Sequence, residues 1–257
     1  MLITLSPAKT LDFETESNLD SFTQPRMLEQ SKILNKRLRK LSKDDLQDLM
    51  SLSDDLTAVN HQRNRDWSPP FDLANAKQAI LAFRGAAFTG LDTDSYSPED
   101  FETAQRSLRI LSGLYGVLRP LDLIHAYRLE MGTKIDNPGG KNLYEFWDTS
   151  ITSLINADLD LHEQRVIVNV ASIEYFKSIK RKVLDARVVT PVFKEIKDGK
   201  LRTIAAFAKP ARGMMASYII RNRLEDADDI KGFKDGGYEF DKSLSTEDEF
   251  VFTRPQP

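Results

Sequence analysis

The chain has 257 residues, of which 40% are hydrophobic and 29% charged, so it is long enough and apolar enough to fold around a core. Its formal net charge of -3 argues against a protein that coats nucleic acid with its whole surface, so the local distribution of charge is the more informative property. Cysteine is absent, which excludes disulfides, thiolate metal sites and a cysteine nucleophile.

The remaining metal-ligating side chains are scattered. His61, His125 and His162 share no metal-ligand spacing, and none of them stands three residues after a glutamate as in ferritin-like sites. We therefore expect no metal site and no cofactor. The first residues lack the pattern of a signal peptide, and no apolar run of about 18 residues occurs, so we expect a cytoplasmic protein with no membrane partner.

The predicted elements of the first half begin with a strand at residues 2–5, which ends at Ser6-Pro7. The apolar spacing across residues 25–56 predicts two helices, and Ser42 with Asp45 resembles a capping box. Residues 54–71 are expected to form a surface loop, and residues 74–83 a helix that gives way to a strand. Ser97-Pro98-Glu99-Asp100 predicts a helix start, with a serine N-cap, a proline and acids in the first turn.

The second half alternates shorter strands and helices. We expect strands over 127–131 and 165–170, helices over 142–157, 173–182 and 211–224, a hairpin of 186–195 with 201–207, and closing strands at 238–240 and 249–253. Because these elements follow no regular βαβ repeat, the sequence predicts the α+β class: one compact domain over residues 1–257, with a mixed sheet surrounded by helices.

The segment LRILSGLYGVLRPLDLI, residues 108–124, contains two glycines three positions apart between apolar runs. The pattern Leu111-x-Gly113-Leu114-x-Gly116 resembles a helix-hairpin-helix element, here over about residues 99–124, which grips a nucleic-acid backbone without reading bases. Three arginines and no acid lie between residues 106 and 121, which suits phosphate contacts. The alternative is a glycine link between two buried helices with no chemistry. The candidate nucleic-acid-binding residues are Arg106, Arg109, Gly113, Leu114, Tyr115, Gly116 and Arg119.

The C-terminal quarter is divided by sign of charge. Residues 200–223 hold six basic groups and no acid, whereas residues 225–249 hold ten acids against three lysines. Either the basic segment lines a cleft for an anionic ligand, or the two segments pair as a surface network of small energetic value.

Several basic and hydroxyl residues are candidates for an anion pocket. Lys9 follows a strand and a turn, although a solvated lysine would explain it equally. Ser172 stands where a strand meets a helix, and a plain N-cap is the favoured explanation of it. Arg128, Glu130 and Lys134 alternate along a strand-like segment, and Arg212 with Lys209 is expected near a helix start, where basic groups oppose the helix dipole. The pocket candidates are Ser6, Lys9, Thr10, Arg128, Lys134, Ser172, Tyr175, Lys177, Lys209 and Arg212.

Five segments of the chain together resemble the YaaA family of bacterial peroxide-stress proteins. The resemblance spans essentially the whole chain, and individual motifs depart slightly from the family pattern, for example at His125-Ala126 before Tyr127. The segments are Ser6-Pro7-Ala8-Lys9-Thr10, Phe88-Thr89-Gly90-Leu91, residues 110–134, residues 169–176 (NVASIEYF) and residues 211–216 (ARGMMA).

The resemblance implies a cytoplasmic protein that helps cells survive hydrogen peroxide by keeping free intracellular iron low. It supplies no reaction and no catalytic residues. The interpretation we favour is a non-catalytic protein that binds duplex or branched DNA without sequence preference. The alternative is an enzyme acting on a nucleotide or another phosphate-bearing small molecule in the basic pocket.

Overall fold

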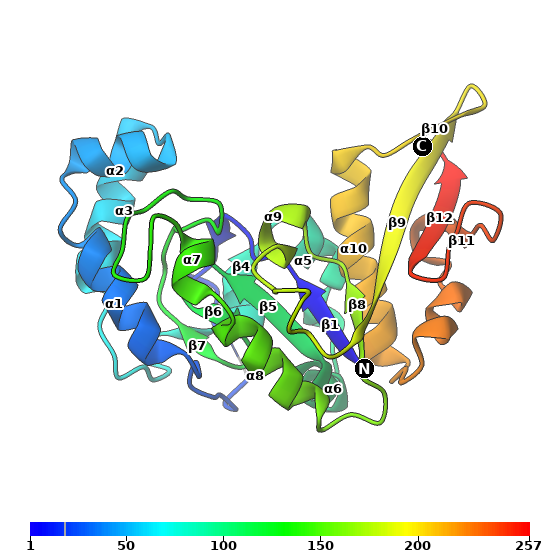
Figure 1. Ribbon diagram of the computed structural model, residues 1–257, viewed down its shortest axis with the longest axis horizontal. Coiled ribbons are helices and arrows are strands. Elements are labelled where there is room, and N and C mark those ends of the chain that lie inside the picture. Colours follow the sequence, from blue (N-terminus) through cyan, green and yellow to red (C-terminus); the bar gives the residue numbers. More distant parts are fainter. Residues whose placement is uncertain (18) are drawn as a thin grey trace.

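The computed structural model describes residues 1–17 and 19–257, and its centre is a mixed sheet of eight strands (Figure 1). The strand order is β11-β12-β9-β8-β1-β5-β6, and β10 pairs with β9. The strands of this sheet are β1 (Leu2–Leu5), β5 (Leu108–Ser112), β6 (Gly116–Leu118), β8 (Val166–Asn169), β9 (Arg187–Lys197), β10 (Lys200–Arg202), β11 (Glu239–Phe240) and β12 (Glu249–Pro255).

Two short antiparallel pairs lie outside this sheet: β2 (Thr10–Leu11) with β4 (Phe83–Arg84), and β3 (Lys77–Gln78) with β7 (Leu123–Ile124). Within the main sheet β1 pairs in parallel with both β5 and β8, and β8 pairs in parallel with β9. The order of the strands therefore reverses at β1: β5 is added on one side of β1, and the later strands β8 and β9 are added on the other side. The predicted α+β class with a mixed sheet is confirmed.

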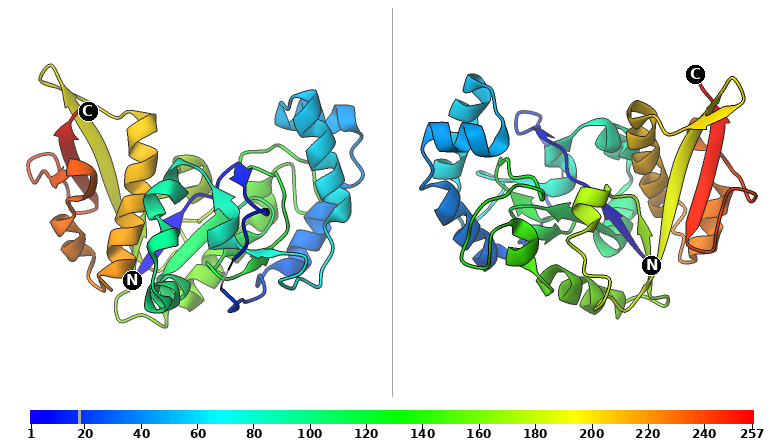
Figure 2. Two further views of the ribbon diagram at one scale, coloured as in Figure 1. Left: turned by 180° about the vertical axis from the view of Figure 1, so that it is seen from behind. Right: turned by 45° about the horizontal axis from the view of Figure 1, so that its top comes forward.

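Helices cover both faces of the sheet. Figure 1 shows α7 and α8 in front of the central strands, and the view from behind in Figure 2 shows α5 and α6 over the opposite face. The helices are α1 (Leu28–Leu38), α2 (Lys43–Met50), α3 (Asp54–Asp66), α4 (Ala79–Ala82), α5 (Ala86–Leu91), α6 (Pro98–Ser107), α7 (Leu143–Trp147), α8 (Ser150–Leu159), α9 (Ile173–Phe176) and α10 (Ala205–Arg221), with 3-10 turns at Thr93–Ser95, Ala227–Gly232 and Asp235–Gly237. Within the described ranges, none of the helices has the length and apolar character needed to cross a membrane.

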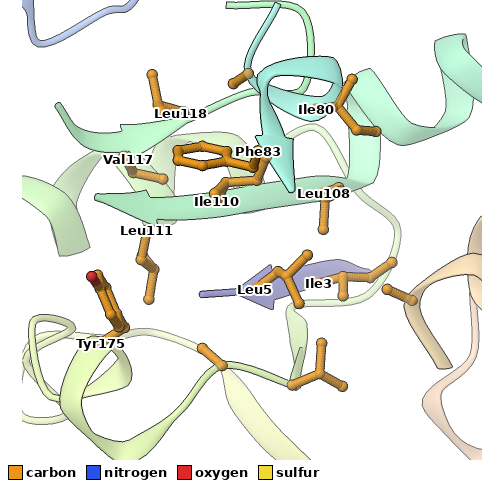
Figure 3. Close-up of a cluster of buried hydrophobic side chains, with 14 of the residues drawn as sticks. Ile3, Leu5, Ile80, Phe83, Leu108, Ile110, Leu111, Val117, Leu118 and Tyr175 are labelled. Atoms are coloured by element: carbon orange, nitrogen blue, oxygen red, sulfur yellow. The ribbon is translucent and has the colours of Figure 1, made fainter. Parts of the chain in front are cut away.

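The core lies on both faces of the central strands. Every residue of β1, β5 and β8 is buried, as expected for parallel strands between two helical layers. Figure 3 shows Ile110 of β5 beside Phe83, whereas Leu111 lies on the side of Tyr175. The alternation at a period of two thus sends neighbouring side chains into two halves of one core.

The predicted helix caps at Ser42 and Ser97 are confirmed. Each serine side chain accepts a hydrogen bond from the backbone N-H three residues on, and the aspartate there accepts from the serine backbone N-H. These capping boxes fix the starts of α2 and α6 through local contacts alone. The predicted hairpin around Asp198 and Gly199 is also confirmed, because β9 and β10 pair across these two residues, both with positive φ. Its second strand ends at Arg202, not at the predicted residue 207, because α10 begins at Ala205.

The predicted helix-hairpin-helix element is wrong, because its glycine turn joins two strands. β5 and β6 form an antiparallel hairpin in which Ser112 pairs with Gly116. Gly116 adopts φ +71°, and a Cβ there would lie 2.6 Å from Met27 Sδ. A Cβ on Gly113 would overlap the carbonyl oxygen of Leu129. Both glycines are therefore explained by close packing and turn geometry, not by access to a phosphate.

The expected loop over residues 54–71 contains a helix, α3. Its buried positions are Thr57, Asn60 and Asn64, which follow helical spacing but are polar, so apolar periodicity could not reveal them. Asn60 donates to the carbonyl of Leu56 at 2.7 Å, and Asn35 of α1 donates to the carbonyl of Asn64 at 3.1 Å. Hydrogen bonds replace apolar contacts on the inner face of this helix.

Four other predicted boundaries differ. Helix α10 begins at Ala205, well before the predicted residue 211, because Pro210 is accommodated inside it. The helix predicted over 142–157 is broken into α7 and α8 at Asp148, which has φ 36°. Helix α9 is one turn long, and residues 127–131 form no strand, so the argument that Arg128, Glu130 and Lys134 share a strand face does not hold.

Candidate functional site

The reversal of strand order beside β1 creates the place where α/β sheets commonly bind ligands, outside the carboxyl ends of the strands. A cavity of about 440 Å³ lies there, which we call the carboxyl-edge cavity. It is lined by the segments that follow β1, β4 and β8 and by one side of α10: Leu5, Ser6, Pro7, Ala8, Lys9, Thr10, Arg84, Gly85, Ala86, Ala87, Phe88, Glu130, Val170, Ser172, Glu174, Tyr175, Lys209 and Arg212.

The floor of this cavity is joined by hydrogen bonds between the two segments that leave β1 and β8. The backbone N-H of Ser172 donates to Ser6 Oγ at 2.9 Å, and the Ser6 hydroxyl donates to Ser172 Oγ at 3.3 Å. One layer below, Thr4 Oγ1 donates to Asn169 Oδ1 at 3.1 Å. Ser172 also caps α9, as predicted. These bonds hold both strand ends in a fixed relation.

Two glycines bring α10 close to α5 and so place its basic residues at the cavity. A Cβ on Gly213 would overlap the carbonyl oxygen of Ala87, and a Cβ on Gly90 would overlap that of Pro210. Only glycine permits such a backbone approach. Lys209 and Arg212 lie on the same stretch of α10, and both line the cavity.

The cationic side chains of the cavity differ in whether a carboxylate neutralises them. Lys9 lies 3.0 Å from Glu130, and Arg84 lies 3.2 Å from Asp12. Arg212 makes no hydrogen bond or ion pair with any described residue, although it is half-buried. Burial lowers the pKa of Arg212, and no carboxylate among those residues offsets the effect. A partly desolvated guanidinium of this kind favours an anion as its partner.

Glu174 and Tyr175 lie on the α9 side of the cavity. Glu174 accepts a hydrogen bond from the backbone N-H of Gly132 at 2.8 Å, which ties the turn after residue 130 to α9. Burial raises the pKa of Tyr175 well above its ordinary value, so the phenol stays protonated. The cavity therefore offers hydroxyl donors, backbone and two cations, Lys209 and Arg212, without carboxylate partners in the described chain.

The structure brings most of the predicted pocket residues together and leaves three outside. Arg128 does not line the cavity but lies 3.4 Å from Glu130, which does. Lys134 is exposed, and Lys177 lies over the ring of Tyr144 at 5.0 Å. Arg212 is two turns inside α10, so the expected position at a helix start is wrong for it. The predicted residues that do line the cavity are Ser6, Lys9, Thr10, Ser172, Tyr175, Lys209 and Arg212.

The predicted nucleic-acid-binding residues do not form one surface. Gly113, Leu114, Tyr115 and Gly116 are buried in the hairpin turn, where the Tyr115 hydroxyl accepts from Trp67 Nε1 at 2.8 Å. Arg106, Arg109 and Arg119 do converge, but on another cavity at the opposite, amino edge of the sheet. The prediction that the glycine turn binds a phosphate backbone is therefore wrong, because other parts of the protein cover the turn.

Three charged lining residues were absent from the predicted pocket: Arg84, Glu130 and Glu174. Arg84 belongs to β4, a two-residue strand that pairs with β2, and nothing in the local sequence marks that long-range pairing. Among the residues that the structure describes, there is no group of three or more histidine, aspartate or glutamate side chains that could hold a metal ion.

Comparison with known proteins gives one consistent result. Residues 1–244 match the family model described as "Peroxide stress protein YaaA". A UPF0246 protein of Colwellia psychrerythraea is 50% identical over 256 residues, which cover 100% of both chains. A UPF0246 protein of Burkholderia mallei is 52% identical over 256 residues, covering 99% of this chain and 98% of the relative.

Proposed function

Because the chain belongs to the YaaA family of peroxide stress proteins, we propose that it serves the peroxide response by binding a phosphate-bearing ligand in the carboxyl-edge cavity. The observation that carries this proposal is the half-buried guanidinium of Arg212, which has no partner among the described residues and faces a cavity at the reversal of strand order. Planar guanidinium groups bind phosphate oxygens through paired N-H donors, which a lysine cannot match.

The first candidate ligand is a nucleotide or another small phosphate ester. A cavity of about 440 Å³ falls within the range of ligand pockets, roughly 300–1,000 Å³. Lys209 and Lys9 would flank the phosphate held by Arg212, and the Ser6 and Ser172 hydroxyls lie at the same strand ends. This ligand would make the protein either a nucleotide sensor or an enzyme, and the second role needs a reacting group still to be identified.

The second candidate is DNA, duplex or branched, bound without sequence preference. It is favoured by three exposed basic residues, Lys197, Lys200 and Arg202, on the β9–β10 hairpin. Both Figure 1 and Figure 2 show this hairpin beside the start of α10, the helix that carries Lys209 and Arg212. In this version phosphates enter the carboxyl-edge cavity, and the buried β5–β6 turn takes no part.

Binding of ATP and of a short labelled duplex, measured across salt concentrations, tests the proposal and separates its two versions. Arg212→Ala should lower the affinity for whichever ligand binds by roughly tenfold or more. For DNA it should also reduce the salt slope by about 1. Arg39→Ala is the matched control, because Arg39 is exposed at the end of α1 and its side chain has no described partner. The proposal would be contradicted if the protein bound neither ATP nor the duplex at low salt. It would also be contradicted if Arg212→Ala and Arg39→Ala lost the same amount of binding affinity.

The effect on iron is the remaining part of the proposal. The family resemblance implies lower free intracellular iron under peroxide stress, and we assign the chain no iron site of its own. Cells that carry Arg212→Ala should therefore retain more free iron after peroxide exposure than cells with the unaltered chain or with Arg39→Ala, as measured by electron paramagnetic resonance of chelated iron. Equal iron levels in all three strains would separate the cavity from the peroxide response.

A further inference from the structure

A second cavity of about 440 Å³ lies at the amino edge of the same sheet, opposite the carboxyl-edge cavity. We call it the amino-edge cavity. It is formed where α6 leads into β5, where α8 leads toward β8, and where α10 ends. Five arginines and three carboxylates line it: Arg26, Arg106, Arg109, Arg119 and Arg223 with Asp158, Glu163 and Glu225.

Asp158 is the centre of this cluster, and both of its carboxylate oxygens already accept hydrogen bonds from arginines. Arg26 donates to both of its carboxylate oxygens, at 2.5 and 2.7 Å, and Arg109 Nε donates to Oδ2 at 2.5 Å. Burial alone would raise the pKa of Asp158, but these hydrogen bonds and charges hold the pKa below its usual range. One negative charge therefore serves two guanidinium groups, which leaves an excess of positive charge.

Arg109 is the buried member of the pair, at 3% exposure. Its Nη1 donates to the carbonyls of Leu108 and Gln105, at 2.7 and 3.1 Å, whereas none of the hydrogen bonds of the described residues uses Nη2. Burial lowers the pKa of Arg109 more than the charge and hydrogen bond of Asp158 raise it, and the like charges of Arg26 and Arg119 add to the lowering. Excess positive charge is thus held in a partly dry place, where an anion is bound most strongly.

Two further arginines extend the positive wall. Arg119 is held by Asp122 at 2.9 Å and by the carbonyl of Gln24, and its Nη1 has no partner among the described residues. Arg106 is exposed and makes no side-chain hydrogen bond or ion pair with that part of the chain. Of the other carboxylates, Glu225 lies 3.6 Å from the amino group of Met1, and Glu163 is exposed.

We propose that the amino-edge cavity is a second ligand site, which binds a small oxyanion: phosphate, pyrophosphate or the phosphoryl group of a small ester. The Arg26–Asp158–Arg109 cluster forms one wall of the site. Arg106 and Arg119 donate further N-H hydrogen bonds to the bound anion. A purely structural ion pair would need only one arginine beside Asp158. Here Asp158 has two, of which Arg109 is buried, and Arg106 and Arg119 add N-H donors that have no partner among the described residues. The volume leaves room for an ester group beyond the phosphate.

Isothermal titration calorimetry with inorganic phosphate, pyrophosphate and glycerol phosphate tests this site. The protein used is the Arg212→Ala variant, so that the carboxyl-edge cavity does not contribute. It should bind at least one of the three probes, and the order of affinities distinguishes free phosphate from an esterified ligand. Arg106→Glu in that background should weaken the bound probe by about tenfold or more. Arg106 is exposed, so this change should leave the free energy of unfolding nearly unaltered.

Arg39→Glu in the same background is the matched control, since it makes the same charge reversal at an exposed arginine far from the cavity. A second readout is the Arg109 Nε-H resonance, which should shift on addition of the bound probe. The proposal is overturned if Arg212→Ala binds none of the probes, or if Arg106→Glu and Arg39→Glu weaken binding equally. These outcomes leave the carboxyl-edge proposal standing, because that proposal is tested with Arg212 present.

Discussion

Arg109 at the amino edge of the sheet and Arg212 at the carboxyl edge are in opposite states. At the amino edge Arg109 is 3% exposed and shares Asp158 with Arg26. At the carboxyl edge Arg212 is half-buried and has no carboxylate partner among the described residues. The number of arginines that line a cavity therefore does not define a ligand site. What matters is whether the fold has already assigned each guanidinium a carboxylate. Removing the carboxylate of a buried assigned pair is costly, whereas an unassigned guanidinium keeps its N-H donors available to a ligand.

The largest test of this contrast removes the shared carboxylate. Asp158→Ala leaves two arginines without their partner, and one of them is buried, so we expect a loss of about 3–5 kcal/mol in the free energy of unfolding. Arg212→Ala leaves no charge without its partner, so it should change this free energy by about 1 kcal/mol at most. Chemical denaturation measures both. Asp185→Asn is the control, because its ion pair with Arg165 is exposed and should contribute under about 1 kcal/mol. Similar losses in all three variants would refute the assignment.

The next test moves the unassigned arginine without changing it. Gly213→Ala inserts a methyl group against the backbone of Ala87 and should push α10 away from α5. We expect a loss of about 1–3 kcal/mol in stability from overpacking. Ligand binding at the carboxyl edge should fall as well, with binding at the amino edge retained. Ala206→Ser, at an exposed position of the same helix, should alter neither property. Unchanged ATP or DNA affinity in folded Gly213→Ala protein would show that the close crossing does not position the site.

A third test asks whether the β5–β6 turn belongs to either site. Gly116→Ala combines strain at φ +71° with a clash at Met27 and Trp147, so stability should fall by about 1–3 kcal/mol. Gly199→Ala is a close control, since Gly199 has φ +70° and nothing within 4 Å of the added carbon. It should show the backbone strain alone. Arg39→Ala is the control for DNA affinity, because Gly199 belongs to the hairpin proposed to contact DNA. If folded Gly116→Ala protein loses DNA affinity while Arg39→Ala protein keeps it, the turn would have a binding role after all.

The smallest expected effect concerns His162, which lines the amino-edge cavity. Burial lowers the pKa of His162 below its ordinary 6.5, and the amino group of Met1 and Arg109 act in the same direction, against Glu225. The unfolded chain therefore binds the proton first, so this residue's contribution to stability is present above pH 6.5 and is lost as pH falls below it. An NMR titration should show the lowered pKa.

The same titration distinguishes the two cavities. Pyrophosphate bound at the amino edge should raise the pKa of His162, because a nearby anion favours the charged imidazole. An anion at the carboxyl edge should leave it unchanged, since no histidine lines that cavity. Arg106→Glu should abolish the rise, and Arg212→Ala should preserve it. A rise that depends on Arg212 instead would place the bound anion at the other edge.

Much of the local structure was predictable from short-range patterns. Strand β1, the capping boxes at Ser42 and Ser97, the Ser172 cap and the hairpin at Asp198-Gly199 each depend on residues within a few positions. The sequence pattern did not predict helix α3, because the inner face of this helix is polar. It also did not predict the first residues of α10, because Pro210 is unusual inside a helix. Where burial is satisfied by hydrogen bonds or where a helix tolerates a proline, apolar periodicity has no signal to offer.

The glycine turn and the arginines around it show the limit most clearly. Leu111 to Gly116 has the spacing of a nucleic-acid-binding link, yet its apolar residues are compatible with a strand as well as a helix, and packing against Leu129 and Trp147 decided for the hairpin. By itself the sequence determined the family, the mixed α+β class, many element boundaries and which residues carry charge. The pairing of Arg109, and the absence of a partner for Arg212 among the described residues, follow from the tertiary structure. The partner of Arg109 is Asp158, which comes from a distant segment, and local sequence carries no record of such contacts.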